Sequence, residues 1–298
     1  MTEDITRYLE NHGIEYKLHA DLSCISTMRV GGTALLFASP DSADKLCRLI
    51  GYLDSVGVKL KVTGRMSNIL SLDEEYQGVI VNTLKLRTYS VTENIITADC
   101  GVYVPKMCRN LASRGISFSP ELSSIPATVG GMLTSNAGAH GKEISDEFID
   151  GSFFDRASKK TLSLKREDMG FSYRTSRLKN SSLVLLSARF KASAASSDNV
   201  LARIGELAEM RRERQPIEYP SLGSVFLRVD GVSAGKLIDE AGLKGVSVGG
   251  AEVSRKHAGF IVNRGGATAR DVKALIDIVR EKVFEHHGVW LDLEIEIL

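Results

Sequence analysis

The sequence lacks a long apolar run and an excess of charge of either sign. No segment reaches the roughly 18 to 20 apolar residues that span a membrane, and the N-terminus lacks the apolar core of a secretion signal. Lysine and arginine number 38 against 37 aspartates and glutamates, so the formal net charge is +1. Proteins that bind nucleic acid or anionic membranes usually carry a basic excess. These absences predict a cytoplasmic protein with no nucleic-acid partner and no membrane span.

Cysteine is also scarce. Cys24, Cys47, Cys100 and Cys108 form no C-x-x-C pair, and the six histidines are scattered except for one adjacent pair. This pattern argues against a disulfide framework and against a structural zinc site. We therefore expect free thiols in a reducing compartment and no metal site.

The length and composition indicate more than one domain. The 298 residues are about twice the length of a usual domain, and 43% of them are apolar. Small and polar residues at 192–199 (ASAASSDN) are typical of a linker. The sequence therefore predicts an α+β protein that is divided into residues 1–75, 76–195 and 196–298.

Hydrophobic spacing predicts the main helices and strands. The segment Ser39-Pro40-Asp41 is expected to start a helix whose apolar face contains Leu46, Leu49, Ile50 and Leu53. Further helices are predicted at 105–114 and 200–214, and strands at 58–62, 79–81, 95–96 and 183–190.

The C-terminal region has the clearest pattern. Thr268 and Asp271 match a capping box, apolar residues follow at helical spacing, and Gly288 is a stop signal. The last ten residues, VWLDLEIEIL, alternate between apolar and acidic side chains from Leu291 onward, which predicts a strand.

Glycine is abundant where proline is not, with 27 glycines against 6 prolines. Two glycine-containing loops follow extended segments: GRMSNIL at 64–70, and IPATVGG at 125–131, which continues into SNAGAHG at 135–141. Loops of small residues can present backbone N–H groups to phosphate oxygens. Neither loop matches the Rossmann or P-loop fingerprint, so together they suggest a pyrophosphate that is held outside those folds. Ordinary tight turns between strands are the alternative.

A series of motifs occurs in a fixed order along nearly the whole chain. They are MRVGG at 28–32, GRxSNIL at 64–70, IPxTVGG and NAGAxG within 125–141, YRTS at 173–176, YPSxGSVF at 219–226, AGKLIDEAGLKG at 234–245 and GGAEVSRKHAGF at 249–260. In this order they resemble the UDP-N-acetylenolpyruvoylglucosamine reductase family, and the short chain is similar to its type II members, which lack an extra loop in the substrate domain.

The resemblance implies a fold and a reaction. The fold would be a two-lobed FAD-binding domain of the vanillyl-alcohol-oxidase type, with lobes at 1–75 and 76–195, followed by an α+β substrate-binding domain at 196–298. The implied reaction belongs to peptidoglycan precursor synthesis. NADPH reduces FAD and leaves, and the flavin then passes hydride to C3 of UDP-N-acetylglucosamine enolpyruvate. Protonation at C2 gives UDP-N-acetylmuramate, and NADPH and the UDP-sugar would share one site.

Three matched positions fit this chemistry. Hydride addition builds negative charge at C2 and on the carboxylate, so the site needs fixed donors or cations and a source of a proton. The resemblance implies that Arg174 stabilises the carboxylate, that Ser224 donates the proton, and that Glu294 hydrogen-bonds near the reacting carbon. Burial beside anions would raise the pKa of Glu294. Each residue also has an ordinary alternative: a solvated arginine, a serine in a turn, and a carboxylate on a wet strand face.

The resemblance also assigns binding residues. The candidates for FAD binding are Gly64, Arg65, Ser67, Asn68, Ile69, Pro126, Thr128, Gly130, Gly131, Asn136 and Gly138. The candidates for binding the substrate and its diphosphate are Tyr173, Arg228, Lys236 and Arg214, for which plain surface exposure is the alternative. Lys256 and His257 lie in a matched motif without an assigned role.

Two loop positions depart from the family pattern, because Met66 and Ala127 stand where the family has glycine. If position 66 requires a positive φ, a side chain there would cost on the order of 1 kcal/mol or more and would crowd a pyrophosphate. One alternative is therefore a divergent paralogue that binds FAD weakly and serves as a nucleotide-binding or regulatory protein. A different FAD oxidase is disfavoured, because the first lobe has no obvious flavin-linking His or Cys motif.

Overall fold

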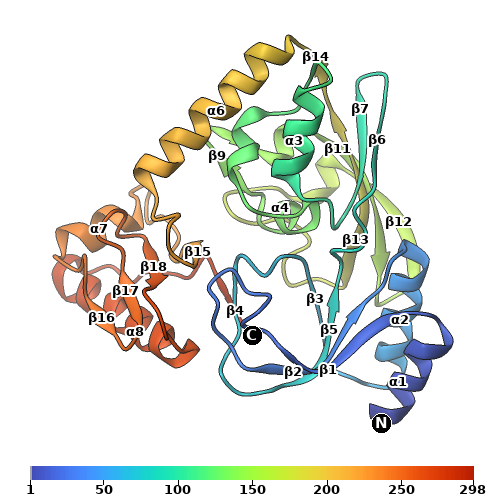
Figure 1. Ribbon diagram of the computed structural model, residues 1–298, viewed down its shortest axis with the longest axis horizontal. Coiled ribbons are helices and arrows are strands. Elements are labelled where there is room, and N and C mark those ends of the chain that lie inside the picture. Colours follow the sequence, from blue (N-terminus) through green and yellow to red (C-terminus); the bar gives the residue numbers. More distant parts are fainter. Residues whose placement is uncertain (1) are drawn as a thin grey trace. The chain divides into compact units, whose positions relative to one another are not determined.

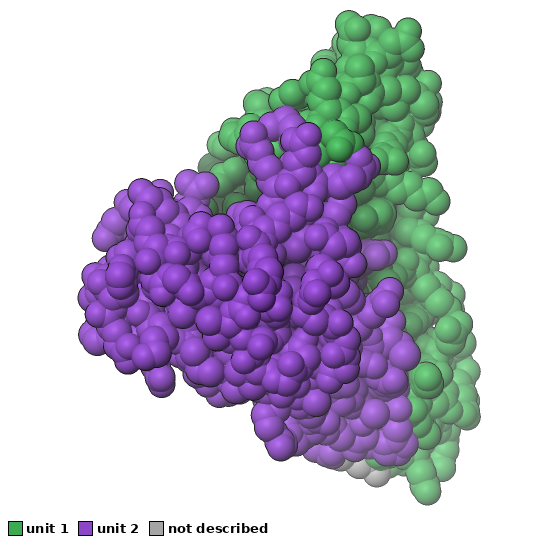
Figure 2. Space-filling view, turned by 60° about the vertical axis from the view of Figure 1, so that its left-hand side comes forward, with its two compact units in different colours: residues 1–18, 36–64, 78–209 green, residues 19–35, 65–77, 210–298 purple. Residues whose placement is uncertain are grey.

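The computed structural model describes residues 2–298, which form two compact units. Each unit is built from segments that are separate in the sequence (Figure 2). Unit 1 contains the described residues up to 18 together with 36–64 and 78–209, and unit 2 contains 19–35, 65–77 and 210–298. Within residues 2–298, no helix combines the length and the apolar character needed to cross a membrane.

Unit 1 holds most of the secondary structure, and three of its strands and its last helix extend past its boundaries. Its helices are α1 (Thr2–Asn11), α2 (Ala43–Ser55), α3 (Val104–Ala112), η1 (Pro120–Ser124), α4 (Val129–Ser135), α5 (Ile144–Glu147), η2 (Arg166–Met169) and α6 (Ser197–Arg214). Its strands are β1 (Glu15–Asp21), β2 (Thr33–Ser39), β3 (Leu60–Thr63), β5 (Tyr76–Asn82), β6 (Tyr89–Thr92), β7 (Ile95–Asp99), β8 (Ile116–Ser117), β9 (Gly138–Ala139), β10 (Lys142–Glu143), β11 (Phe148–Asp155), β12 (Lys160–Lys165), β13 (Leu183–Lys191) and β14 (Ser193–Ala194).

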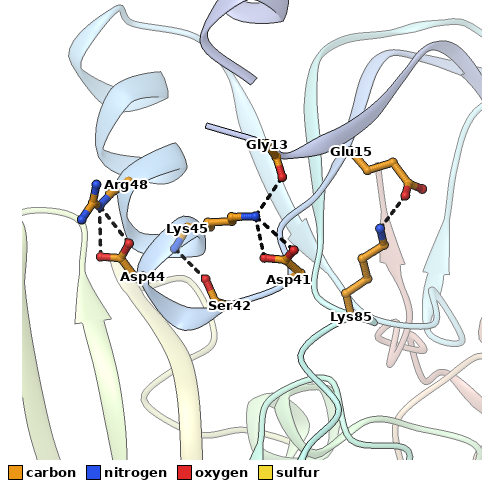
Figure 3. Close-up of polar contacts among 8 residues, drawn as sticks. All are labelled: Gly13, Glu15, Asp41, Ser42, Asp44, Lys45, Arg48 and Lys85. Carbon is orange, nitrogen blue, oxygen red and sulfur yellow. Dashed lines mark hydrogen bonds and ion pairs between the residues drawn. The ribbon is translucent and has the colours of Figure 1, made fainter. Parts of the chain in front are cut away.

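Helix α2 packs beside α1 (Figure 1), where the rings of Tyr8 and Tyr52 stack with their centroids 3.9 Å apart. Its predicted apolar face is buried, but its start is three residues later than predicted, because the Ser42 hydroxyl caps the helix by accepting from the Lys45 N–H. The Lys45 ammonium then bonds the Gly13 carbonyl at 2.8 Å and pairs with Asp41, as Figure 3 shows. These contacts tie the start of α2 to the turn after α1.

The larger sheet of unit 1 has the strand order β12-β11-β13-β7-β6, and every neighbouring pair is antiparallel. Its core contains the fully buried rings of Phe148, Phe153 and Phe190. Each such ring stabilises the fold by about 1.5–3 kcal/mol relative to an exposed position. The sheet therefore gives the loops of unit 1 a rigid support.

The segment predicted as a linker is structured. Ser193–Ala194 form β14, which pairs with β8, and α6 begins at Ser197, whose hydroxyl donates to the Ala112 carbonyl at 2.7 Å. The predicted linker at 192–199 is therefore ordered by pairing with a strand that is distant in the sequence, and its role between two domains stays a prediction. The division of the chain at 75 and 195 into three domains stays a prediction.

Unit 2 contains a four-stranded antiparallel sheet in the order β15-β18-β17-β16, with α8 packed against it (Figure 1). The apolar stripe of α8 is buried, and the predicted capping box at Thr268 and Asp271 and the left-handed Gly288 cap are all present. The elements of unit 2 are β4 (Ile69–Leu70), β15 (Ser221–Ser224), α7 (Ala234–Glu240), β16 (Ser247–Val248), β17 (Ala251–Val253), β18 (Phe260–Asn263), α8 (Ala269–His287) and β19 (Glu296–Ile297).

The C-terminal strand is much shorter than the alternating pattern predicts. Leu291 and Ile295 are buried, but only Glu296–Ile297 form a strand, β19, which pairs in parallel with β4. Upstream, Leu293 makes a single bridge to Phe226. The alternation therefore marks Leu291 and Ile295 correctly as buried but not Ile297, which is 37% exposed. The predicted extended length is wrong, because the chain has a partner strand only at its end.

Candidate active site

Gly64, the first residue of the first glycine loop, lies against Thr128 of the second loop within unit 1. A Cβ atom on Gly64 would lie 2.6 Å from the hydroxyl oxygen of Thr128, closer than real side chains come. Thr128 is buried and caps α4, where its Oγ1 accepts a hydrogen bond from the Gly131 N–H at 3.3 Å. Only glycine therefore fits at position 64 without displacing this cap.

The first amides of α4 have partners inside the chain. The N–H of Val129 donates to the carbonyl of Val102 at 2.9 Å, and that of Gly130 donates to the carbonyl of Cys100 at 2.8 Å. A Cβ on Gly130 would lie 3.2 Å from the same Cys100 oxygen, so tight internal packing favours glycine there. These two amides are therefore engaged within the chain, and the predicted contact of the second loop with a pyrophosphate stays a prediction.

The first loop rests on residues that the sequence motifs did not reveal. The side-chain amide of Asn82 donates to the Gly64 carbonyl at 2.8 Å and to the Thr63 hydroxyl at 3.2 Å. The Thr83 hydroxyl donates to the Thr63 carbonyl, and a Cβ on Gly101 would lie 1.9 Å from the Thr83 carbonyl oxygen. The one available signal was the polar pair Asn82-Thr83 directly after an apolar strand.

The two departures from the glycine pattern have different outcomes. Met66 has a φ of +51°, so the conditional prediction of a strained backbone there is confirmed, at a cost of roughly 1–2 kcal/mol. Its side chain is only 2% exposed, so it is not presented to a ligand that arrives from solvent. Ala127 does not have a left-handed backbone, and its N–H bonds the Ile125 carbonyl. A side chain at 127 is therefore tolerated without strain.

Tyr173 and Arg174 form the tip of a two-residue turn in unit 1, where Ser172 and Thr175 exchange backbone hydrogen bonds at 3.1 and 3.2 Å. Arg174 has a φ of +54°, and such backbone strain is concentrated at functional sites. Its guanidinium donates to the Gly138 carbonyl at 3.2 Å and lies 5.2 Å from the centroid of the Tyr173 ring. The turn therefore places the guanidinium beside the NAGAxG segment.

Asn136 supports this turn from the end of α4. It is buried with a φ of +43°, and its side-chain nitrogen donates to the Ser172 carbonyl at 3.1 Å and to the Glu143 carboxylate at 2.7 Å. Its side-chain oxygen accepts from the Ser145 N–H at 3.3 Å. Both amide donors are therefore used within the protein, and the predicted contact of Asn136 with FAD stays a prediction.

In unit 2, the backbone brings three predicted residues close together. The Glu294 N–H donates to the carbonyl of Val225, the residue after Ser224, at 2.9 Å. The Asn68 side chain donates to the Glu294 carbonyl at 3.0 Å. Gly223, just before Ser224, has a φ of +79° and open space where a Cβ would be. Ser224, Glu294 and Asn68 are thus neighbours, with room beside Ser224.

The remaining predicted residues lie on both units. Tyr173 is 46% exposed in unit 1, whereas Arg214 ends α6 and Arg228 is exposed in unit 2. Lys236 on α7 is exposed and pairs with Glu240 at 3.7 Å. The other FAD candidates lie in the two loops: Arg65, Ser67 and Ile69 in the first, and Pro126, Gly131 and Gly138 in or after the second.

The thiols near these loops are unsuited to chemistry. Burial raises the pKa of Cys100 to about 12, and the negative charge of Asp99 adds to the effect. Burial also raises the pKa of Cys108 to about 12. Because the reactive form of cysteine is the thiolate, these residues are packing groups at neutral pH.

Comparison with known proteins covers both halves of the chain. A family model described as an FAD binding domain matches residues 34–152, and one described as the UDP-N-acetylenolpyruvoylglucosamine reductase C-terminal domain matches residues 215–298. The reductase of Caldicellulosiruptor saccharolyticus is 40% identical, over 98% of this chain and 94% of its own. The chain belongs to the UDP-N-acetylenolpyruvoylglucosamine reductase family. The reductase of Clostridium tetani is 36% identical, over 99% of this chain and 96% of its own.

Solved structures agree with this assignment. The reductase of Thermus caldophilus has a TM-score of 0.80 and 31% identity, and the match covers 95% of this chain and 98% of that one. An alkyldihydroxyacetonephosphate synthase shares the fold alone, with a TM-score of 0.50 and 17% identity over 64% of this chain. The predicted fold class is confirmed: an FAD-binding domain of the vanillyl-alcohol-oxidase type precedes a C-terminal α+β domain. The family is one of oxidoreductases, which confirms the predicted enzyme class and favours it over a divergent binding protein.

Proposed function

We propose that this chain reduces UDP-N-acetylglucosamine enolpyruvate to UDP-N-acetylmuramate, with NADPH as the reductant, in the cytoplasmic synthesis of peptidoglycan precursors. The observation that carries the proposal is the similarity to reductases over almost the full length of both chains, which includes both matched domains. NADPH and the UDP-sugar would use the same site one after the other.

The residues of the two loops fit FAD as the bound group. Gly64 packs against Thr128 without a side chain, so this end of the first loop is bare backbone that a flat, charged cofactor can approach. Ser67, Asn68 and Thr128 would offer polar side chains, and Gly131 and Gly138 would let backbone lie close to the ligand. Bound FAD supplies a two-electron carrier between NADPH and the enol ether.

The substrate carboxylate determines what the protein must provide. Arg174 would hold it, because a guanidinium matches two carboxylate oxygens and keeps its charge at all relevant pH values. Its bond to Gly138 and its strained turn would fix the guanidinium before the substrate arrives. Charge that develops on the carboxylate would then meet a preorganised cation, which lowers the barrier more than a mobile one.

Ser224 would deliver the proton to C2, and Glu294 would hydrogen-bond beside the reacting carbon. The backbone link from Glu294 through Val225 sets the spacing of these two residues within unit 2. The open space at Gly223 would admit the substrate next to the Ser224 hydroxyl. Tyr173, Arg228, Lys236 and Arg214 are proposed to bind the rest of the UDP-sugar, mainly its diphosphate.

The test separates the two half-reactions. Ser224→Ala should still allow NADPH to bleach the flavin at the normal rate, while formation of UDP-N-acetylmuramate falls by about 10²-fold or more, as expected on loss of a general acid. Ser221→Ala is the matched control, because Ser221 lies on the same strand, β15, and the variant keeps the backbone carbonyl that accepts from the Thr27 hydroxyl. Equal loss in both variants, or full turnover by Ser224→Ala, would refute the proposed role of Ser224.

A further inference from the structure

His257 lies in the connection between β17 and β18, in a motif to which the proposed reaction gives no role. Its ring Nδ1 accepts a hydrogen bond from the Gly259 N–H at 3.1 Å. The ring also packs edge to face on Phe260, with the centroids 4.9 Å apart, and the His257 carbonyl accepts from the Phe260 N–H. The connection is therefore folded around the imidazole.

A chain of backbone hydrogen bonds leads from this connection to Ser224 and Glu294. The Gly259 carbonyl accepts from the Val225 N–H at 2.9 Å, and the Val225 carbonyl accepts from the Glu294 N–H at 2.9 Å. Ser224 itself pairs with Phe260 across β15 and β18. Because these hydrogen bonds link the three segments, a displacement of Gly259 would also shift Ser224 and Glu294.

Two glycines leave space for the ring. A Cβ on Gly259 would lie 3.0 Å from the His257 Cε1, and a Cβ on Gly235, at the start of α7, would lie 3.1 Å from the same atom. Burial lowers the pKa of His257, and the positive charge of Lys244 lowers it further. The ring is therefore neutral at neutral pH, and Nδ1 keeps the lone pair that the Gly259 N–H requires.

We infer that His257 is a positioning residue that holds Ser224 and Glu294 in register by accepting the Gly259 N–H. The inference rests on the proposed function, because it concerns the step in which reduced flavin is reoxidised by the substrate. Without the acceptor, the buried N–H of Gly259 has no partner. The connection between β17 and β18 would then move so that this N–H can find another partner. Because small displacements of catalytic groups reduce rates strongly, substrate-driven reoxidation should slow by about tenfold or more.

Two variants distinguish the loss of the hydrogen-bond acceptor at His257 from a change in side-chain volume. His257→Phe keeps a ring of similar size between the two glycines but has no acceptor, whereas His257→Asn loses the ring but places a carbonyl oxygen near the Nδ1 position. Both are studied as FAD-loaded, full-length protein by anaerobic rapid mixing. The first experiment follows flavin reduction by NADPH, and the second follows reoxidation of the reduced protein by UDP-N-acetylglucosamine enolpyruvate.

The inference predicts that His257→Phe reduces with NADPH at the wild-type rate but reoxidises at least about tenfold more slowly. His257→Asn should recover most of the reoxidation rate even if its thermal stability is lower. If His257→Phe reoxidises like wild type, or if both variants slow in proportion to their loss of stability, His257 is a packing residue and the inference is wrong. Failure of the wild type to reoxidise with this substrate would instead refute the proposed function.

Discussion

The contact between Gly64 and Thr128 gives the sharpest quantitative prediction. In Gly64→Ala, the new methyl group would lie 2.6 Å from the Thr128 Oγ1, so the hydroxyl must move and α4 loses its N-cap. Overpacking costs about 1–3 kcal/mol and loss of a threonine cap costs about 1 kcal/mol. We therefore expect Gly64→Ala to lower the unfolding free energy of the apo protein by about 2–4 kcal/mol.

A second substitution should relieve this clash. Thr128→Ala alone should cost about 1 kcal/mol through the lost cap. In the double variant the offending oxygen is absent, and the next atom, the Cβ of residue 128, lies 3.5 Å from the new methyl group, an ordinary contact. Gly64→Ala combined with Thr128→Ala should therefore be about as stable as Thr128→Ala alone. Such strong non-additivity is the signature of a direct contact.

Urea unfolding of the four proteins measures this coupling, and titration with FAD measures its functional effect. FAD affinity should fall in Gly64→Ala, and the double variant should bind FAD about as tightly as Thr128→Ala alone, because both lack the clash and Thr128 is itself proposed to contact the cofactor. Gly64→Ala combined with Thr128→Ser keeps the oxygen and serves as the control that should not recover. Additive losses of unfolding free energy, or a Gly64→Ala protein as stable as wild type, would refute the reasoning.

Three further predictions concern the cysteines, Met66 and Asp155. A thiol reagent at pH 8 should modify exposed Cys24 but leave Cys100 and Cys108 unmodified until the protein unfolds, because burial raises the pKa of both thiols to about 12. Met66→Gly should lower the unfolding free energy measured in urea by about 2 kcal/mol, because losing a buried methionine side chain (about 2–5 kcal/mol) outweighs relief of the +51° backbone (about 1–2 kcal/mol). Hydrogen bonds from two serine hydroxyls, and then from backbone, lower the pKa of Asp155 to about 2, so its contribution to stability is present above about pH 4 and is lost as pH falls toward 2. In Asp155→Asn, the unfolding free energy measured in urea should therefore fall less steeply between about pH 4 and pH 2 than in the wild type.

Each of these predictions has a contrary outcome. Modification of Cys100 in the folded protein as fast as that of Cys24 would show that the thiol is accessible. A gain of stability in Met66→Gly would show that backbone strain outweighs burial at this position. If the unfolding free energy of Asp155→Asn falls at low pH as steeply as that of the wild type, the hydrogen-bonded carboxylate makes no net contribution to the pH dependence.

Features set by neighbouring residues could be predicted from the sequence. The cap, apolar stripe and stop signal of α8 were all predictable, because each depends on residues within a few turns. The glycine that the family has at position 66 raised the possibility of a positive φ at Met66, which the structure shows. The resemblance likewise singled out Ser224 and Glu294 as candidates, although no local pattern showed that one backbone link joins their segments.

Features set by distant partners could not be predicted. The polar segment 192–199 resembles a linker, but β8 supplies a partner strand far away in the sequence. The alternating C-terminus pairs only at Glu296–Ile297, because β4 is two residues long. Gly101 and Gly130 are glycines because distant carbonyl groups lie against them, which no local pattern reveals. A glycine-rich loop thus predicts close approach without showing whether a ligand or the chain itself approaches.

The central claim is that electrons from NADPH reach an enolpyruvyl UDP-sugar through the flavin of this protein. The direct test is to reduce the FAD-loaded protein with one equivalent of NADPH without oxygen and then to mix it with UDP-N-acetylglucosamine enolpyruvate. The proposed function predicts that the oxidised flavin absorbance returns within one turnover and that one equivalent of UDP-N-acetylmuramate forms. Flavin that stays reduced with this substrate, and is reoxidised only when oxygen is admitted, would contradict it.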